Sequence, residues 1–187
     1  MPYDLLLRGG TVFDGTGADP VEADVAVRDG HVVEVAPAIE PSAAARVVDV
    51  SNRWVVPGFI DNHTHYDAEL LAAPGLEESV RHGVTTVAIG SCSLGTVFAE
   101  PDDAADLFSR VEALPRPFVL DTLNRYKTWR TPSDYAAALD ASPLGPNVAT
   151  YLGHSDLRVA TLGLGPATDG DYRPTRAEQR AMEAALE

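Results

Sequence analysis

The chain has 187 residues, 45% of them hydrophobic, so it can bury a core although it is shorter than the roughly 250 residues of a typical eight-stranded α/β barrel. Its formal net charge of −14 disfavours nucleic acid and anionic membrane surfaces as partners, because both require a basic surface. The N-terminus lacks a basic leader region and no apolar run reaches the ~18–20 residues of a membrane span, so we expect a cytoplasmic protein.

The first 53 residues read as short strands separated by glycine turns, which predicts a small sheet-rich segment. Asp29-Gly30 lies between two alternating hydrophobic runs and predicts a hairpin, because a type I′ turn requires positive φ at both central residues. The segment has too few strands to close a core alone, so we expect it to pack against a partner. The expected strands are Leu5–Leu7, Thr11–Phe13, Ala23–Val27, His31–Val35 and Arg46–Val50.

From Trp54 onward, strands alternate with helical stretches, and the strand ends recur about every thirty residues, the length of a βαβ unit. This spacing predicts a parallel sheet, and four such units are half of an α/β barrel. The expected strands are Trp54–Ile60, Thr85–Ile89, Phe118–Leu123 and Asn147–Leu152. The expected helices are Glu69–His82, Asp102–Leu114 and Ser133–Leu139.

Near the end of the chain, Thr175 and Glu178 form a capping-box pattern that predicts the start of another helix. No Gly or Pro follows to end that helix before Glu187. A chain that ends inside a helix after four strands leads us to expect a truncated sequence rather than a complete domain.

The apolar run Trp54–Ile60 leads directly into a His-x-His pair, His63 and His65. Because side chains alternate along a strand, Asp61 and both histidines project to one face. Two residues span about 6.6 Å, which lets both imidazoles turn a nitrogen onto one metal ion. Such a pair also arises by chance, but its place favours a metal site, because the sites of barrel and open-sheet enzymes gather at the carboxyl ends of strands.

Cys92 is the only cysteine, which excludes an intrachain disulfide. It follows the expected strand Thr85–Ile89, and if that strand is a parallel neighbour of Trp54–Ile60, Cys92 lies at the same end of the sheet as the two histidines. Thiolate and imidazole are preferred zinc ligands. A cysteine alone is more often a small buried residue, and the nearby His63 and His65 favour the ligand interpretation.

His154 follows the last expected strand and would lie at the same end of the sheet. It would orient substrate or support the metal site, although a turn with a helix cap at Ser155 or Asp156 explains the same residues without a function. The loop Asn124–Arg130 has two interpretations, as cations that meet a substrate carboxylate or as a solvated loop, and we favour the second. Its Lys127 is the only lysine of the chain.

The chain carries five motifs in this order: Leu7–Gly17, Val56–Asp67, Gly83–Val87, Gly90–Cys92 and Gly153–Arg158. Together they resemble the amidohydrolase superfamily and, within it, the N-acyl-D-amino-acid deacylases, or D-aminoacylases. The first two motifs are shared widely in the superfamily, and the cysteine after the second barrel strand is typical of the D-aminoacylase branch. The resemblance covers nearly the whole chain and corresponds to the N-terminal portion of that family.

The resemblance implies an α/β fold, the N-terminal half of a metal-dependent amidohydrolase (β/α) barrel preceded by a small β-sandwich segment. The sandwich segment would comprise residues 1–53, and the first four βα units residues 54–187. The resemblance also implies zinc as the cofactor and a small N-acyl amino acid as the substrate. His63, His65 and Cys92 would hold the metal, with Asp61 and His154 beside it to contact substrate or support the ligands.

The implied activity is zinc-dependent hydrolysis of a linear amide, which releases a D-amino acid and a carboxylate from an N-acyl-D-amino acid. The family takes two further histidine ligands and an aspartate base from later strands, so the base is expected beyond Glu187 and no catalytic residue within the chain. Two alternatives stay open: a cyclic amide or imide hydrolase of the same superfamily, or a catalytically incomplete half-barrel. The cyclic-amide enzymes use a carboxylated lysine after strand four, where this chain has His154. The family commonly has Asn-Cys-Gly where this chain has Ser91-Cys92-Ser93.

Overall fold

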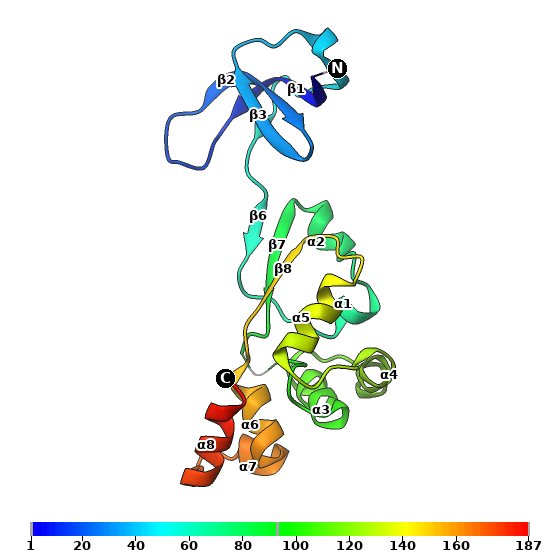
Figure 1. Cartoon of the computed structure of the whole chain (residues 1–187), viewed down its shortest axis with the longest axis vertical. Helices are drawn as coiled ribbons and strands as arrows, with labels where there is room; N and C mark the ends of the chain where they lie inside the picture. The colour runs from blue at the N-terminus through cyan, green and yellow to red at the C-terminus, as the bar shows by residue number, and fades with distance from the viewer. Residues whose placement is uncertain (1, 93, 187) are drawn as a thin grey trace. The chain divides into compact units, whose positions relative to one another are not determined.

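Figure 1 shows a computed structural model of the chain, which describes residues 2–92 and 94–186. The chain divides into two compact units, residues 1–57 and residues 58–187. Each unit is built around a sheet of its own.

The first unit contains a five-stranded sheet in the order β3-β2-β1-β4, with β5 paired to β1. β1 pairs antiparallel with β2 and parallel with β4 and β5. The predicted hairpin is confirmed: Asp29 and Gly30 join β2 to β3 with φ values of 50° and 74°. The elements are β1 (Tyr3–Val12), β2 (Val21–Arg28), β3 (His31–Ala36), a 3-10 helix (Pro41–Ala43), β4 (Ala44–Asp49) and β5 (Trp54–Val55).

The predicted division of β1 into two strands at Gly9-Gly10 is wrong. The two glycines form a bulge, where the register of β1 against β2 shifts and Gly9 has a φ of 74°. A side chain at Gly10 would place its Cβ 2.7 Å from Val55 Cγ2. The buried Asp24 carboxylate fixes the bulge, because it accepts hydrogen bonds from Gly9 N at 2.8 Å and Ile39 N at 2.9 Å.

The second unit contains a three-stranded parallel sheet in the order β6-β7-β8. In Figure 1, α1 to α5 gather on one side of these strands, and α6 to α8 follow the end of β8. The strands are β6 (Phe59–Asp61), β7 (Val84–Ile89) and β8 (Asn147–Thr150). The helices are α1 (Glu69–Ala72), α2 (Glu77–Arg81), α3 (Pro101–Val111), α4 (Arg116–Tyr126), α5 (Pro132–Asp140), α6 (His154–Leu162), α7 (Leu164–Thr168) and α8 (Arg176–Ala184).

The predicted strand Phe118–Leu123 is wrong, because these residues lie in α4. Val119 and Leu123 are four positions apart and are buried in one cluster with Phe108 of α3, so the burial follows the helical period. Pro117 in the first turn is also compatible with a helix start, because the amides of that turn have no intrahelical acceptor. The described residues therefore form three parallel strands in this unit rather than four.

The predicted strand Trp54–Ile60 consists of two strands in different units. β5 belongs to the sheet of the first unit and β6 to the sheet of the second, with Pro57 and Gly58 between them. Pro57 has no N–H to donate to a ladder. A Cβ at Gly58 would lie 2.1 Å from Thr85 Oγ1, so the backbone passes β7 too closely for any side chain.

The predicted helix Glu69–His82 is split into α1 and α2, because Pro74 between them cannot continue a helix. The predicted capping box is confirmed: Thr175 N donates to Glu178 Oε2 at 2.7 Å, and Glu178 N donates to Thr175 Oγ1 at 3.3 Å. The expectation that this helix runs on to the last residue is wrong, because α8 ends at Ala184 with Ala185 as its C-cap.

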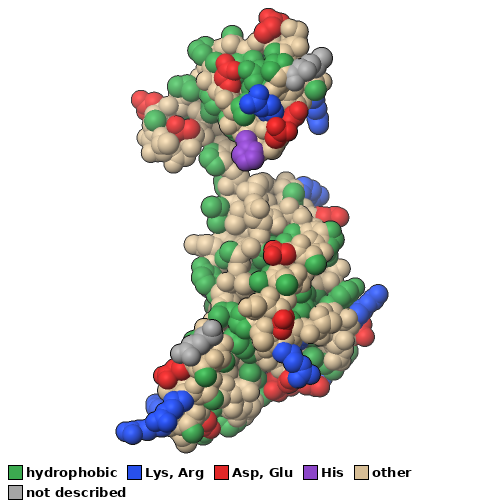
Figure 2. Space-filling view, in the orientation of Figure 1, with side chains coloured by type: hydrophobic (Ala, Val, Ile, Leu, Met, Phe, Trp, Pro, Cys, Tyr) green, Lys and Arg blue, Asp and Glu red, His purple; other side chains and the backbone are tan. Residues whose placement is uncertain are grey.

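The distribution of charge on the surface indicates whether nucleic acid could bind there. On the face shown in Figure 2, Lys and Arg side chains lie scattered among acidic ones. This arrangement gives nucleic acid no basic surface on that face. Among the helices of the described residues, none combines the length and the apolar character that a membrane crossing needs.

Candidate metal centre

The loops after β6 and β7 meet at the carboxyl edge of the sheet, because these strands are parallel neighbours. The loop after β6 carries His63 and His65, and the loop after β7 carries Cys92. Thr64, buried between the histidines, donates from both its N and its Oγ1 to Ala88 O of β7, at 3.1 and 2.8 Å. These bonds fix the histidine backbone against the strand that leads to the cysteine.

The three predicted ligands lie together. His63 Nε2 is 3.0 Å from Cys92 Sγ, and the two imidazole centroids are 5.3 Å apart. One ligand atom from each of His63, His65 and Cys92 lies within 4.8 Å of the others. The predicted convergence is confirmed, and metal binding by these residues stays a prediction.

Glu112, a residue outside every motif of the sequence, contacts this group. The Nδ1–H of His65 donates to Glu112 Oε1 at the C-terminal end of α3. His65 Nε2 is buried and has no hydrogen-bond partner among the described residues. One nitrogen of the ring is therefore engaged, and the other is left with an open lone pair.

Buried carboxylates fix the cysteine loop, which we define as residues 90–99 without Ser93, a residue outside those described. Asp67 Oδ2 accepts from Gly90 N at 3.2 Å, and burial raises the pKa of Asp67 to about 7. Asp156 accepts from Phe98 N at 2.8 Å and Ala99 N at 2.7 Å, and burial raises its pKa. The alternative interpretation of this segment, a helix cap at Ser155 or Asp156, is wrong, because α6 begins after Gly153 without a side-chain cap.

Lys127 supports the same loop. The sequence offered two interpretations of the Asn124–Arg130 segment, substrate-binding cations or a solvated loop, and neither describes this role of Lys127. Its Nζ donates to Thr96 O at 2.7 Å and Val97 O at 2.9 Å and lies 5.1 Å from the centre of the Trp129 ring. Burial lowers the pKa of Lys127. Trp129 Nε1 also donates to Thr96 O, at 2.7 Å. The only lysine of the chain is thus engaged in holding the cysteine loop.

Asp61 and His154, the residues expected beside the metal, both lie at the carboxyl edge of the sheet. Asp61 Oδ1 accepts from His63 N at 3.3 Å, so it supports the backbone of one expected ligand. His154 is exposed at the start of α6, just after β8. The residues after β8 run beside the start of the cysteine loop. Tyr151 N donates to Ile89 O at 3.0 Å, one residue before that loop begins. Contact of Asp61 or His154 with substrate stays a prediction.

The arrangement fits a zinc ion. Zn–N bonds of about 2.0–2.1 Å and Zn–S bonds of about 2.3 Å place the donors of a tetrahedral site roughly 3.3–3.6 Å apart. The 3.0 Å contact and the 4.8 Å limit among the three donors bracket this value. Two imidazoles and a thiolate are typical zinc ligands, and the open Nε2 of His65 is a donor that lacks a partner within the described residues.

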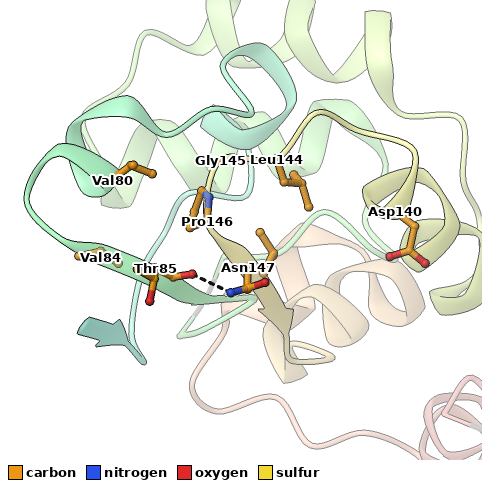
Figure 3. Close-up of a pocket in the computed structure, with 9 residues that line it drawn as sticks. Val80, Val84, Thr85, Asp140, Leu144, Gly145, Pro146 and Asn147 are labelled. Carbon is orange, nitrogen blue, oxygen red and sulfur yellow. Dashed lines mark hydrogen bonds between the residues drawn. The ribbon is translucent and has the colours of Figure 1, made fainter. Parts of the chain in front are cut away.

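A cavity of about 470 Å³ lies at the opposite edge of the sheet. Figure 3 shows residues from α2, β7 and the start of β8 around it, with Asn147 Nδ2 donating to Thr85 O at 3.0 Å. These residues mark the amino ends of the strands. Active sites in parallel α/β folds occur at the carboxyl ends, so this cavity is not the candidate centre.

The second unit has a parallel sheet, and its loops bring imidazole and thiolate groups together at the carboxyl edge. These features are typical of one class of proteins, the α/β enzymes with a metal-dependent site. Comparison with known proteins narrows this class. The model of the amidohydrolase family matches residues 46–184, and the chain belongs to that family.

Three relatives illustrate the match. An uncharacterised protein of Mycobacterium tuberculosis is 58% identical over 186 residues, which covers 99% of this chain and 30% of the relative. The D-aminoacylase of Alcaligenes xylosoxydans is 37% identical over 164 residues, covering 86% of this chain and 31% of the enzyme. The structure of N-acyl-D-glutamate deacylase from Bordetella bronchiseptica, complexed with zinc and a phosphonate inhibitor, matches with a TM-score of 0.78 and 33% identity, covering 100% of this chain and 36% of that one.

The structural match confirms the expected fold class. The chain spans about a third of the length of the relatives it matches.

Proposed function

We propose that the chain forms part of a zinc-dependent amidohydrolase that cleaves the linear amide of N-acyl-D-amino acids and releases the D-amino acid and a carboxylate. The observation that carries the proposal is the meeting of His63, His65 and Cys92 at the carboxyl edge of the sheet. The similarity of the chain to a D-aminoacylase and to an N-acyl-D-glutamate deacylase supports N-acyl-D-amino acids as the substrate class.

The residues of this chain have distinct tasks in the proposal. His63, His65 and Cys92 would hold the zinc ion, which supplies Lewis acidity toward the acyl carbonyl and toward water. Asp61 fixes the backbone of the first ligand through His63 N. His154 is exposed at the same edge of the sheet, and in the proposal it would contact the substrate.

The linear amide is favoured over a cyclic amide or imide by the surroundings of Lys127. A carboxylated lysine needs a free Nζ beside the metal, whereas the Nζ of this lysine donates to two backbone carbonyls of the cysteine loop. The histidine and cysteine donors would hold a metal without a carboxylated lysine.

The test compares three substrate classes with the purified, zinc-loaded enzyme of which this chain is proposed to form part: N-acetyl-D-amino acids, their L-enantiomers and hydantoins. We expect turnover of the D-enantiomers above the other two classes, and its loss in Cys92→Ala. Cys92→Ser serves as a second variant that keeps the side-chain volume closer to that of cysteine. Faster hydrolysis of hydantoins than of N-acyl-D-amino acids, or turnover that persists in both variants, would contradict the proposal.

A further inference from the structure

The contact between His65 and Glu112 joins two segments that are 47 positions apart in the chain. The side chains are 22% and 36% exposed, so the pair is shielded in part from water. The contact leaves Nε2 as the ring nitrogen available to a metal.

Glu112 is held in place by its own segment. Its N donates to Phe108 O at 2.9 Å, and Ala113 after it has a φ of 52°, so α3 ends at this point. Phe108 is fully buried in one cluster with Ala68, three residues after His65, and Leu114 packs against the same cluster. The end of α3 is therefore anchored to the segment that carries His65.

We propose that Glu112 is a positioning residue that holds His65 as the Nδ1–H tautomer and aims its Nε2 at the metal. This inference rests on the proposed metal site. A carboxylate that accepts the second N–H of a histidine ligand fixes the orientation of the ring and raises its basicity, and loss of such a partner typically lowers metal affinity 10–100-fold. Glu112 acts through His65 and does not itself contact substrate.

A matched control exists in the same place. Glu69 and Glu112 both line a cavity beside His65, and both are exposed glutamates. Glu69 has no hydrogen bond to His65 among the described residues, so Glu69→Gln removes the same charge at a similar location and leaves the contact intact. Any general effect of negative charge near the metal would appear in both variants.

The experiment measures the affinity of the 187-residue chain for Co²⁺ and Zn²⁺ by chelator competition, together with the Co²⁺–thiolate absorption. Glu112→Ala should lower both affinities about 10–100-fold. Glu112→Gln should lie between it and the wild type, because its side-chain oxygen still accepts the bond without the charge. Glu69→Gln should match the wild type. In the metal-free protein, ¹⁵N NMR should show His65 as the Nδ1–H tautomer, and Glu112→Ala should lose this preference.

The outcomes separate this inference from the proposed function. Unchanged affinity in Glu112→Ala, equal losses in Glu69→Gln and Glu112→Ala, or an Nε2–H tautomer in the wild type would overturn the role of Glu112. Should Glu112→Ala fail to fold by circular dichroism, Glu112→Gln and the wild-type tautomer decide. If Cys92→Ala binds Co²⁺ as well as the wild type, the metal site itself is wrong.

Discussion

The two units differ in how their buried polar groups are paired. In the first unit both oxygens of the buried Asp24 accept backbone hydrogen bonds. In the second unit four buried polar atoms have no partner among the described residues: His65 Nε2, Asp67 Oδ1, Thr96 Oγ1 and Tyr135 Oη. Buried polar groups are normally paired, and exceptions concentrate where function competes with packing. We therefore expect changes in the first unit to affect stability alone and changes around the cysteine loop to affect metal binding as well.

The largest effect should come from Cys92→Ala. Structural zinc sites bind with roughly 10–16 kcal/mol over four ligands, or about 2.5–4 kcal/mol per ligand, so loss of one ligand should lower zinc affinity about 100–1000-fold. Cys92 is exposed, so the free energy of unfolding of the metal-free chain should change little. Zinc titration and urea unfolding measure the two quantities. A large loss of stability with unchanged zinc affinity would assign Cys92 to the fold rather than to the centre.

Asp156→Ala and Asp24→Ala form a matched pair across the two units, since each removes a carboxylate that accepts two backbone hydrogen bonds. Each should destabilise its own unit by about 3 kcal/mol, because buried amides lose their acceptor. Only Asp156→Ala should also weaken zinc binding, through the cysteine loop. In a Trp54→Phe background, fluorescence of the buried Trp129 follows the second unit alone. Equal effects of both substitutions on zinc affinity would contradict the claim that only the second unit supports the metal site.

The pH dependence of the unfolding free energy should reveal the raised pKa of Asp156 in the second unit. Burial raises its pKa in the folded state above the unfolded value of about 3.9, so the folded state keeps a proton that the unfolded state releases. This contribution is complete below the unfolded pKa and is lost as the pH rises through the folded pKa. The unfolding free energy of the wild type, relative to Asp156→Asn, should therefore fall as the pH rises above about 4. Urea titrations of both proteins measure it, and a flat or rising difference would refute the assignment.

The smallest effect should come from Gly30→Ala in the hairpin of the first unit. Gly30 has a φ of 74°, and a Cβ added there would meet no atom within 4 Å, so the substitution strains only the backbone. The expected loss of stability is about 1 kcal/mol, with zinc affinity unchanged. Urea unfolding and zinc titration measure both. A change in zinc affinity would show that the first unit is energetically coupled to the centre.

The local pattern of the sequence was sufficient to predict the three candidate ligands. His63 and His65 directly follow one strand, and Cys92 follows a strand one βαβ unit later, so topology brings them together, although β6 ends at Asp61 and the histidines lie in the loop after it rather than alternating along a strand. Glu112 could not be predicted in this way. It reaches His65 from the end of a helix, across 47 positions, and nothing in its local sequence distinguishes it from the other acidic residues.

The errors in predicted elements have a common physical source. Phe118–Leu123 contains residues that suit a strand, and only the packing of Val119 and Leu123 against α3 shows the helical period. Asp156 and Lys127 looked like a cap and a solvated cation, because a sequence does not show which backbone amides and carbonyls the fold leaves for side chains to bind.

The central claim is that His63, His65 and Cys92 bind one zinc ion together. X-ray absorption of the chain loaded with one equivalent of zinc tests it most directly, since the Zn–S distance of about 2.3 Å is resolved from Zn–N distances of about 2.0–2.1 Å. The account predicts one sulfur and at least two imidazole nitrogens, with the sulfur shell absent in Cys92→Ala. A first shell of nitrogen and oxygen alone in the wild type, identical to that of Cys92→Ala, would contradict it.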